Sequence, residues 1–341
     1  MSVSVVILNW NGEKYLNEFL PVLLKNIEDV PGAEVVVADN GSTDGSLQLL
    51  SEKFPTVKVD AFDKNYGFAE GYNKALKNIN TEYYVLLNSD VEVTKGWLST
   101  LYTYMNENPD VAACQPKILS YHRRNYFEYA GAAGGFIDKY GYPFCRGRIF
   151  GEVEEDWGQY DDIKDIYWAT GACLFIRSAD YWEAGGLDDE FFAHMEEIDL
   201  CWRLKNAGFA IAYISKSTVY HVGGSVISYG SPQKLFYNFR NSLVLLLKNE
   251  PLSRLMWLMP YRLVLDGVAA FHLLFQGKRI EFFTVIKAHF NFYFNINKWL
   301  KHRKEAQKTV SSNPNKNGIY PGSIIWQYFV KKQKTFDQLK W

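Results

Sequence analysis

The sequence predicts an α/β protein: a doubly wound, parallel sheet with a helical extension after it. Strand-like runs alternate with helix-like segments from residue 3 to residue 88, and three successive strands end in Asn or Asp. The last quarter of the chain loses this alternation and is rich in Leu, Phe, Trp and Tyr. Strands joined by crossover helices run parallel, so their carboxyl ends meet at one edge of the sheet.

Each early element is predicted from its own residue pattern. β-branched and apolar runs predict strands, and apolar residues at helical spacing predict helices. In chain order the predicted elements are a strand at 3–8, a helix at 13–27, a strand at 35–38, a helix around 47–50, a strand beginning at 57, a helix at 70–78 and a strand at 83–88.

Polar side chains cluster where these strands end. In open α/β sheets, ligands bind beyond the carboxyl ends of the strands. Asn88 and Asp90 follow an apolar run, and their oxygens suit a hard cation such as Mg2+ or Mn2+. Taken alone, an Asx turn that closes the strand is the more common explanation for them. The residues at the three strand ends are Asn9 and Asn11, Asp39 and Asn40, and Asn88 and Asp90.

The later chain is less regular. Residues 119–165 predict irregular loops or short hairpins, and order returns with a predicted strand at 167–176. The other predicted elements are a helix from about 196, strands at 211–214 and 218–221, and a helix from about 233. No G-x-G-x-x-G follows the first strand and no G-x-x-x-x-G-K-[ST] occurs, which excludes the dinucleotide-binding and P-loop classes.

Composition predicts one large domain with a charged appendage. The chain has 341 residues, of which 48% are hydrophobic and 22% charged. Residues 250–341 contain 15 Lys/Arg and 5 Asp/Glu, whereas residues 1–249 contain 22 and 33. A basic end on an acidic body indicates contact with an anionic surface. We expect no nucleic-acid partner, because these charges lie among long apolar faces.

The cysteines and the N-terminus predict a cytoplasmic location. Cys114, Cys145, Cys173 and Cys201 form no C-x-x-C pair, which is typical of a reduced protein. The apolar run at 3–8 is too short for a signal peptide, and no basic segment precedes it.

Five short motifs together resemble the family 2 glycosyltransferases with the GT-A fold, and most closely their rhamnosyltransferase-like branch. The motifs are Asp39-Asn40-Gly41-Ser42-Thr43-Asp44, Asn88-Ser89-Asp90, Thr170-Gly171-Ala172, the segment 194–203 (HMEEIDLCWR), and His221-Val222-Gly223-Gly224-Ser225. The resemblance runs from Val3 to about Asn249. It implies a mixed, mostly parallel sheet and inverting transfer of a sugar from a nucleotide-diphosphate donor, with a divalent metal.

By this resemblance, Asn88-Ser89-Asp90 occupies the family's D-x-D position. Asn88 replaces the first carboxylate, so Asp90 is the principal metal ligand. With one charge fewer at the site, metal binding depends more on the donor's own phosphates. His221 resembles a late histidine that completes the metal shell or touches the diphosphate, followed by a glycine loop able to wrap phosphate. A strand-end histidine that hydrogen bonds to a neighbour is the alternative.

The resemblance also implies the donor-binding residues. Asp39 corresponds to the aspartate that accepts the imide N–H of uracil or thymine, while a turn-forming Asx residue is the alternative. Arg240, in the pattern Tyr237-x-x-Arg240-Asn241, is expected to contact a diphosphate, with a surface salt bridge as the alternative. The remaining donor-binding residues are Asn9 and Asn11 in the first loop, Asn65, Gly67 and Asn73 in the second, and Asn88.

Three acids at the start of one predicted helix supply the candidate catalytic groups. Acidic side chains in a first helical turn usually interact favourably with the helix dipole, and this explains one or two of the three acids. In the family this segment usually reads Glu-Asp, and the second acid is the general base. Glu197 holds that position, while Glu196 and Asp199 orient the acceptor or pair with Arg203. Thr170, Gly171 and Ala172 resemble the acceptor-side loop.

The domain prediction is a catalytic domain at 1–249, an amphipathic helical region at 250–304 and a tail at 305–341 that runs back over the body. Charged residues interrupt both apolar stretches of the helical region, so neither is predicted to span a membrane. Contact with a membrane interface, packing on the catalytic domain and a homodimer contact all fit the pattern.

The predicted function is metal-dependent, inverting sugar transfer to a hydroxyl of a growing cell-surface glycan. dTDP-rhamnose is the first candidate donor, and a UDP-sugar is the near alternative. The acceptor is a saccharide or, if the helices meet the inner face of the cytoplasmic membrane, a lipid-linked saccharide. The alternative from another class is a non-catalytic nucleotide-sugar-binding or assembly subunit of a polysaccharide-synthesis complex.

Overall fold

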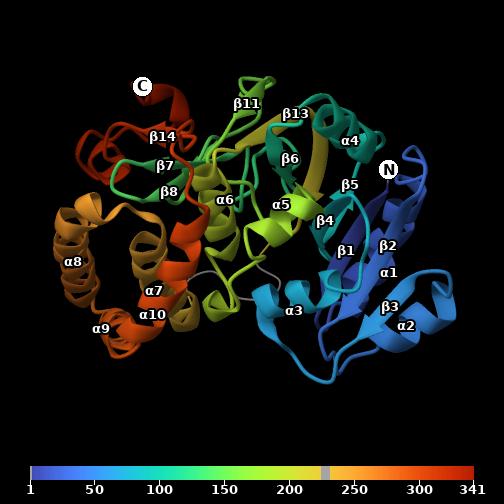
Figure 1. Ribbon diagram of the computed structural model, residues 1–341, viewed down its shortest axis with the longest axis horizontal. Helices are drawn as coiled ribbons and strands as arrows, with labels where there is room; N and C mark the ends of the chain where they lie inside the picture. The colour runs from blue at the N-terminus through green and yellow to red at the C-terminus, as the bar shows by residue number, and fades with distance from the viewer. Residues whose placement is uncertain (1, 224–230) are drawn as a thin grey trace.

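The chain is organised around one large mixed sheet (Figure 1), in a computed structural model that describes residues 2–223 and 231–341. The strand order is β11-β13-β6-β12-β4-β1-β2-β3, and β5 pairs with β13. The strands are β1 (Val3–Asn9), β2 (Ala33–Asp39), β3 (Lys58–Ala61), β4 (Tyr83–Asn88), β5 (Val91–Val93), β6 (Val111–Ser120), β11 (Ile163–Asp165), β12 (Cys173–Arg177) and β13 (Ala210–His221).

The predicted mixed sheet is confirmed. Strands β3, β2, β1 and β4 are parallel neighbours, as their alternation with helices predicts. Strand β12 is inserted antiparallel between β4 and β6. In the register of β1, Asn9 lies beside Asp39 of β2 and Leu8 beside Asn88 of β4, so the polar strand ends share one edge.

Helices cover both faces of this sheet, because successive strand residues point to opposite sides. Val85 packs in the core under α1, α2 and α4, and Leu86 packs in the core that contains residues of α3, α5 and α6. The helices are α1 (Glu13–Lys25), α2 (Ser46–Lys53), α3 (Gly67–Leu76), α4 (Trp97–Glu107), α5 (Ser178–Glu183), the short η1 (Asp189–Phe191) and α6 (Glu196–Ala207).

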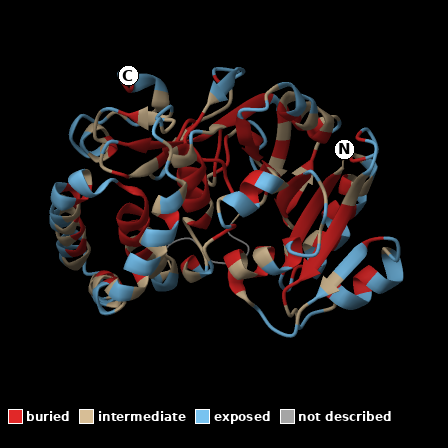
Figure 2. Cartoon of the chain, in the orientation of Figure 1, coloured by how far each residue is buried: buried red, intermediate tan, exposed pale blue. Residues whose placement is uncertain are grey.

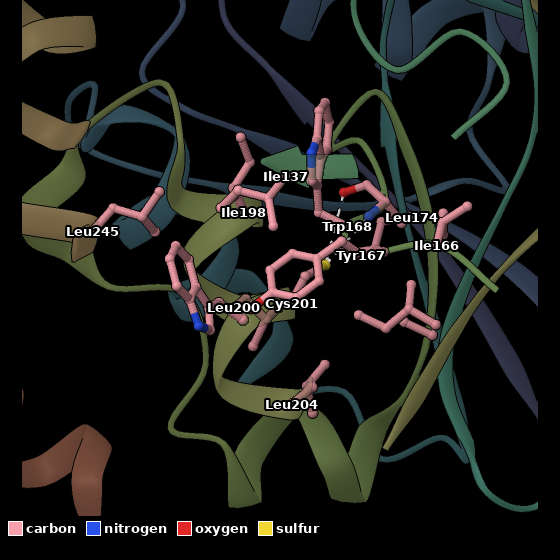
Figure 3. Close-up of a cluster of buried hydrophobic side chains, with 14 of the residues drawn as sticks. Ile137, Ile166, Tyr167, Trp168, Leu174, Ile198, Leu200, Cys201, Leu204 and Leu245 are labelled. Atoms are coloured by element: carbon pink, nitrogen blue, oxygen red, sulfur yellow. Dashed lines mark hydrogen bonds between the residues drawn. The ribbon is translucent and has the colours of Figure 1, made fainter. Parts of the chain in front are cut away.

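The apolar side chains of α6 anchor it in the second of these cores. Leu200, Cys201 and Leu204 are almost fully buried and lie among Tyr167, Trp168 and other apolar side chains (Figure 3). The amide of Ala169 also donates a hydrogen bond to the Cys201 sulfur at 3.4 Å. Each buried leucine contributes about 1.5–3 kcal/mol. The helix that begins with Glu196 and Glu197 is therefore fixed to the sheet.

Residues 119–165 form short strands, in agreement with the predicted hairpins, and the tail returns to them. Strand β14 pairs in parallel with β7, and the ring of Phe336 lies 4.9 Å from that of Phe136. This second sheet has the order β10-β9-β8-β7-β14. Its strands are β7 (Gly135–Asp138), β8 (Pro143–Cys145), β9 (Arg148–Ile149), β10 (Glu152–Val153) and β14 (Ile319–Tyr320).

The C-terminal helices differ sharply in burial. Helix α7 is buried from Arg240 to Asn249, whereas α8 and α9 lie at the edge of the molecule with many exposed residues (Figure 2). Among the described residues, α8 is the one helix that is long and apolar enough to cross a membrane, by length and composition alone. These elements are α7 (Pro232–Asn249), α8 (Leu252–Phe275), α9 (Arg279–Phe294), α10 (Ile296–Ala306), η2 (Gln307–Thr309), η3 (Trp326–Val330) and η4 (Phe336–Gln338).

Three predicted strands were wrong in their bounds. The strand predicted at 167–176 begins only at Cys173, because Trp168 forms a bridge to Gly135 outside the main sheet. The strands predicted at 211–214 and 218–221 are one strand, β13, whose pairing with β6 shifts register between Ile214 and Thr218. An irregularity of this kind interrupts the sequence pattern without ending the strand.

Candidate active site

Backbone pairing brings Asp90 and His221 together at the carboxyl end of β4. The chain turns after Asn88 and continues as β5, which pairs antiparallel with the last residues of β13. In this register Val91 lies opposite His221, and the amide of Val222 donates to the carbonyl of Asp90 at 3.0 Å. Two residues far apart in the sequence are therefore held as neighbours by the sheet.

The His221 ring lies between two carboxylates. Its Nε2 is 3.1 Å from Asp90 Oδ1 and its Nδ1 is 3.2 Å from Glu128 Oε2, and all three residues are buried. Burial favours the neutral ring, but the charges of Asp90 and Glu128 outweigh it and raise the pKa of His221 well above its ordinary value. Sequence reasoning missed Glu128, which lies in the irregular 119–165 region within no motif.

These residues fit a divalent metal. A histidine that presents one nitrogen to the ion usually places the other against a carboxylate, and Glu128 occupies that position. The Asn88 amide lies 3.4 Å from His221 Nε2, at the same point. Within residues 2–223 and 231–341, no group of three or more His, Cys, Asp or Glu side chains could hold an ion by itself. Gly224 and Ser225 of the predicted phosphate loop lie outside the described residues.

The first two strand ends are joined by a polar network. Asn9 Nδ2 donates to Asp39 Oδ2 at 2.9 Å, and the Ser42 amide donates to Asp39 Oδ1 at the same distance. Asn11 accepts a hydrogen bond from the amide of Thr43 at 2.7 Å. Asp39 is fully buried, and it holds the 39–43 turn in position. The turn-forming role is thus observed, and base recognition by Asp39 remains a prediction.

The second predicted donor loop is tied to the segment before α6. Asn65 accepts from the amide of Gly67 at 2.7 Å, and the amide of Phe68 donates to the carbonyl of Phe192 at 3.0 Å. Gly67 has a φ of +78°, and a Cβ there would lie 2.8 Å from the Phe192 ring, so only glycine fits. This loop therefore packs directly against the segment that precedes α6.

Asn73 has a structural role inside the fold, and its donor contact stays a prediction. Its Oδ1 accepts from the Tyr181 hydroxyl at 2.6 Å and the Leu187 amide at 3.1 Å. Its Nδ2 donates to the Leu187 carbonyl at 2.7 Å. Because both ends of the amide are used, Asn73 links α3 to the 187–189 turn.

Glu196 and Glu197 begin α6 directly after an unusual turn. Phe192, His194 and Met195 have φ angles of 62°, 70° and 74°, and each such non-glycine residue costs about 1–3 kcal/mol. One carboxylate oxygen of each glutamate is buried without a hydrogen-bond partner among the residues that the structure describes. Burial raises the pKa of both side chains, and the charge of Glu197 raises that of Glu196 further. Strain and unpaired carboxylates together are typical of a catalytic segment.

The predicted acceptor-side loop connects this segment to the end of β4. A Cβ on Gly171 would lie 3.8 Å from the Glu197 Cβ, and the carbonyl of Ala172 accepts from the Asn88 amide at 3.0 Å. Thr170 closes the loop, because its hydroxyl accepts from the Ala172 amide at 3.2 Å. The loop therefore links the candidate base to the candidate metal site.

The structure contradicts an acceptor-orienting role for Asp199 and supports its pairing with Arg203. Asp199 is fully buried, and its Oδ2 lies 2.8 Å from the Arg203 guanidinium and 2.8 Å from Lys248. Asn249 donates to the other carboxylate oxygen at 2.8 Å. This cluster joins α6 to α7 and leaves no face of the carboxylate for a substrate.

Arg240 and its neighbour support the unusual turn, and the diphosphate contact of Arg240 stays a prediction. Arg240 is buried, and its guanidinium donates to the carbonyls of Glu190 and Phe191 at 2.9 and 3.1 Å. Asn241 Nδ2 lies within 3.2 Å of the carbonyls of Phe191, Ala193 and His194. The two side chains thus hold the backbone that precedes Glu196.

Comparison with known proteins identifies the family. Residues 4–155 match the family model described as glycosyl transferase family 2. Over these residues the chain is similar to glycosyltransferase family 2. This glycosyltransferase is 24% identical over 234 residues to the N-acetylglucosaminyl-diphospho-decaprenol L-rhamnosyltransferase of Mycobacterium tuberculosis, an alignment that covers 64% of this chain and 75% of the relative. The resemblance to the rhamnosyltransferase-like branch is confirmed.

Two further comparisons agree with this assignment. The low-salt glycan biosynthesis hexosyltransferase of Haloferax volcanii is 23% identical over 290 residues, covering 82% of this glycosyltransferase and 87% of the relative. GalNAc-T7, solved with UDP, GalNAc and Mn2+, superposes with a TM-score of 0.56 at 16% identity, over 72% of this chain and 47% of its own. That likeness shows the GT-A fold, as predicted.

Replacing Asp199 with Asn is expected to destabilise this glycosyltransferase by about 3–5 kcal/mol. The substitution keeps the shape of the side chain but leaves Arg203 and Lys248 buried without their countercharge. Urea unfolding followed by circular dichroism measures the change. Asp110→Asn at an exposed site is the matched control. A free energy of unfolding equal to that of the wild type would contradict the structural role.

Proposed function

We propose that this glycosyltransferase moves a sugar from dTDP-rhamnose or a UDP-sugar, with inversion, to a hydroxyl of a growing cell-surface glycan. The observation that carries the proposal is the line of contacts from Asp90 and Asn88 through the 170–172 loop to Glu197. In this arrangement, a candidate phosphate-side group and a candidate base would lie on either side of one short loop.

The donor would bind along the carboxyl ends of β1, β2 and β4. In this proposal Asp39 faces the edge of the nucleotide base. Thymine and uracil present the same imide group to it. Asn9 and Asn11 complete the first loop, and Asn65 and Gly67 the second. The network that joins Asn9, Asn11 and Asp39 supports one continuous nucleotide-binding surface.

Asp90, Asn88 and His221 would hold Mg2+ or Mn2+ together with the donor phosphates. When bound, such an ion neutralises the charge that grows on the departing diphosphate. Glu128 would keep the His221 ring oriented, because it contacts the opposite ring nitrogen. The Mn2+ in the solved GalNAc-T7 complex supports this role for a divalent ion.

Glu197 would act as the general base. Its carboxylate takes the proton of the acceptor hydroxyl while the acceptor oxygen bonds to the anomeric carbon. The bond from that carbon to the diphosphate breaks on the opposite face, which inverts the anomeric configuration. A raised pKa suits this task, because a more basic carboxylate accepts a proton more readily.

The acceptor would enter over Thr170, Gly171 and Ala172, beside Glu197. We propose a lipid-linked saccharide at the cytoplasmic face of the membrane. The name of the mycobacterial relative, which acts on a decaprenyl-diphosphate-linked sugar, supports this acceptor class. The buried cysteines are consistent with a reducing, cytoplasmic location.

A donor panel tests this function. Purified full-length chain is incubated with dTDP-rhamnose and UDP-sugars, with Mn2+, Mg2+ or EDTA, and release of nucleoside diphosphate is measured. We expect release from one donor class that requires the metal and is accelerated by acceptor. Donor binding without release, under all conditions and with a lipid-linked acceptor present, would instead identify a non-catalytic sugar-nucleotide-binding subunit.

The rate should rise with pH as Glu197 loses its proton. Below its pKa in the folded protein, Glu197 is protonated and cannot accept the acceptor proton. Because burial raises this pKa, the acid limb of kcat/KM should have its midpoint above 4.5, the ordinary value for glutamate. Rates at saturating metal locate the limb, and circular dichroism at each pH excludes unfolding. A rate that stays constant down to pH 4.5 would contradict this assignment.

A further inference from the structure

Helix α8 buries a pair of opposite charges and exposes large apolar residues, which is unusual for a helix on a water-soluble protein. Arg262 and Asp266 are buried and paired at 2.9 Å, and Arg262 also donates to the Ser242 hydroxyl of α7 at 2.8 Å. On the outer side, Val264 is 65% and Phe275 is 86% exposed. A helix in contact with water normally turns its charges outward and its apolar residues inward.

Helix α9 also exposes large apolar residues on its outer side, although its inner side is apolar too. Val285 and Phe292 face inward, whereas Phe283 and Phe294 are 64% and 83% exposed. We name the outward residues Val264, Val268, Phe275, Ile280, Phe283 and Phe294 the hairpin face. Its helices lie at the edge of the molecule, away from the sheet (Figure 2). Exposed apolar groups concentrated in this way mark a surface that contacts another apolar phase.

We propose that the hairpin face docks into the interface of an anionic lipid bilayer. Residues 252–304 contain nine Lys/Arg and two Asp/Glu, and one of those two acids, Asp266, is buried. Lys278 and Arg279 are exposed at the turn between α8 and α9, and Lys287 is exposed on α9. Apolar side chains bordered by cations match acyl chains bordered by anionic headgroups.

The helices lie in the bilayer surface and do not cross it. Although α8 is long enough to span, one side of it packs on α7 and α9 through Arg262 and Asp266. His289 of α9 also lies 3.2 Å from Asp266. Insertion across the bilayer would separate these buried charges from their partners, which costs far more than shallow contact.

A second copy of the chain fits the hairpin face less well. An isologous dimer would place two hairpins with the same excess of positive charge against each other. A bilayer with anionic lipids removes this repulsion. The charge pattern therefore favours lipid over self-association.

A cavity beside the hairpin also supports docking to a bilayer, provided that the proposed function holds. The cavity has a volume of about 620 Å3 and is lined by Leu273 and Lys278 at the hairpin tip. It is also lined by Glu128, which contacts His221. A docked hairpin would bring this cavity to the membrane surface, where a lipid-linked acceptor with its phosphates could approach the metal side of the site.

Vesicle sedimentation of the full-length chain tests the proposal without requiring turnover. We expect sedimentation with vesicles of equal parts phosphatidylcholine and phosphatidylglycerol, and much less with pure phosphatidylcholine or at high salt. The double variant Phe275→Ser, Phe294→Ser should bind at least about tenfold more weakly. Trp157→Ser, which removes an aromatic ring that is 77% exposed on the body, should bind like the wild type.

Three results would overturn the proposal. The first is a chain that stays in the supernatant with both kinds of vesicle. The second is a dimer, seen by light scattering without lipid, that the double variant dissociates. The third is a bound chain that high salt and alkaline carbonate fail to extract, which would indicate a spanning helix. Donor hydrolysis in the same preparations reports on the proposed function separately, because it needs no vesicles.

Discussion

Glu197→Gln is expected to lower kcat by about 10²–10⁴-fold and to leave donor binding almost unchanged. The amide keeps the size of the side chain but cannot accept the acceptor proton. Glu197 lies beside Gly171 and begins α6, so the substitution should not disturb the strand ends where the donor is proposed to bind. Single-turnover transfer and titration with nucleoside diphosphate separate the two effects.

Two control variants make this result specific. Glu107→Gln changes an exposed glutamate on α4 and should retain wild-type activity. Glu196→Gln should keep the acid limb of the wild type if Glu197 is the base, because burial, and not the charge of Glu196, raises the pKa of Glu197. Wild-type kcat in Glu197→Gln would show that another group accepts the proton.

Asp90→Asn is expected to reduce kcat/KM by about 10²–10³-fold, because a metal that stabilises the leaving diphosphate contributes several kcal/mol. The amide retains an oxygen but loses the negative charge that would hold the ion. The loss should be accompanied by a higher metal concentration for half-maximal activity. Initial rates over a series of Mn2+ and Mg2+ concentrations measure both quantities.

Two further variants test this prediction. Glu128→Gln removes the charge behind His221 and should weaken metal affinity by about 10–100-fold. This loss should be smaller than that in Asp90→Asn. Asp110→Asn at an exposed position should have no effect. An unchanged metal requirement in Asp90→Asn would place the ion elsewhere or remove it from the reaction.

The strands that alternate with helices could be predicted from sequence, because each carries its own periodic pattern. Strands β1, β2 and β4 were found in this way, and so was the shared edge of their polar ends. The antiparallel strand β12 could not be placed from pattern alone, since pairing between distant segments leaves no local signal. The mixed sheet was predicted only from the resemblance to a family.

The candidate site was only partly predictable, for a related reason. Asp90 and His221 lie in recognisable motifs, and the structure brings them together. Glu128 has no motif, and only the folding of the irregular region places it behind His221. Asn73, Asp199 and Arg240 are polar residues near the site whose hydrogen bonds are used within the protein. A sequence cannot separate such supporting groups from groups that face a substrate.

Support of the turn before α6 by Arg240 and Asn241 limits how this enzyme can be re-engineered. A chimera that joined its N-terminal sheet to the C-terminal helices of a relative would also exchange the two side chains that hold the backbone in front of Glu196. Grafts intended to alter acceptor choice should therefore retain α7 as native sequence and begin the foreign segment after it.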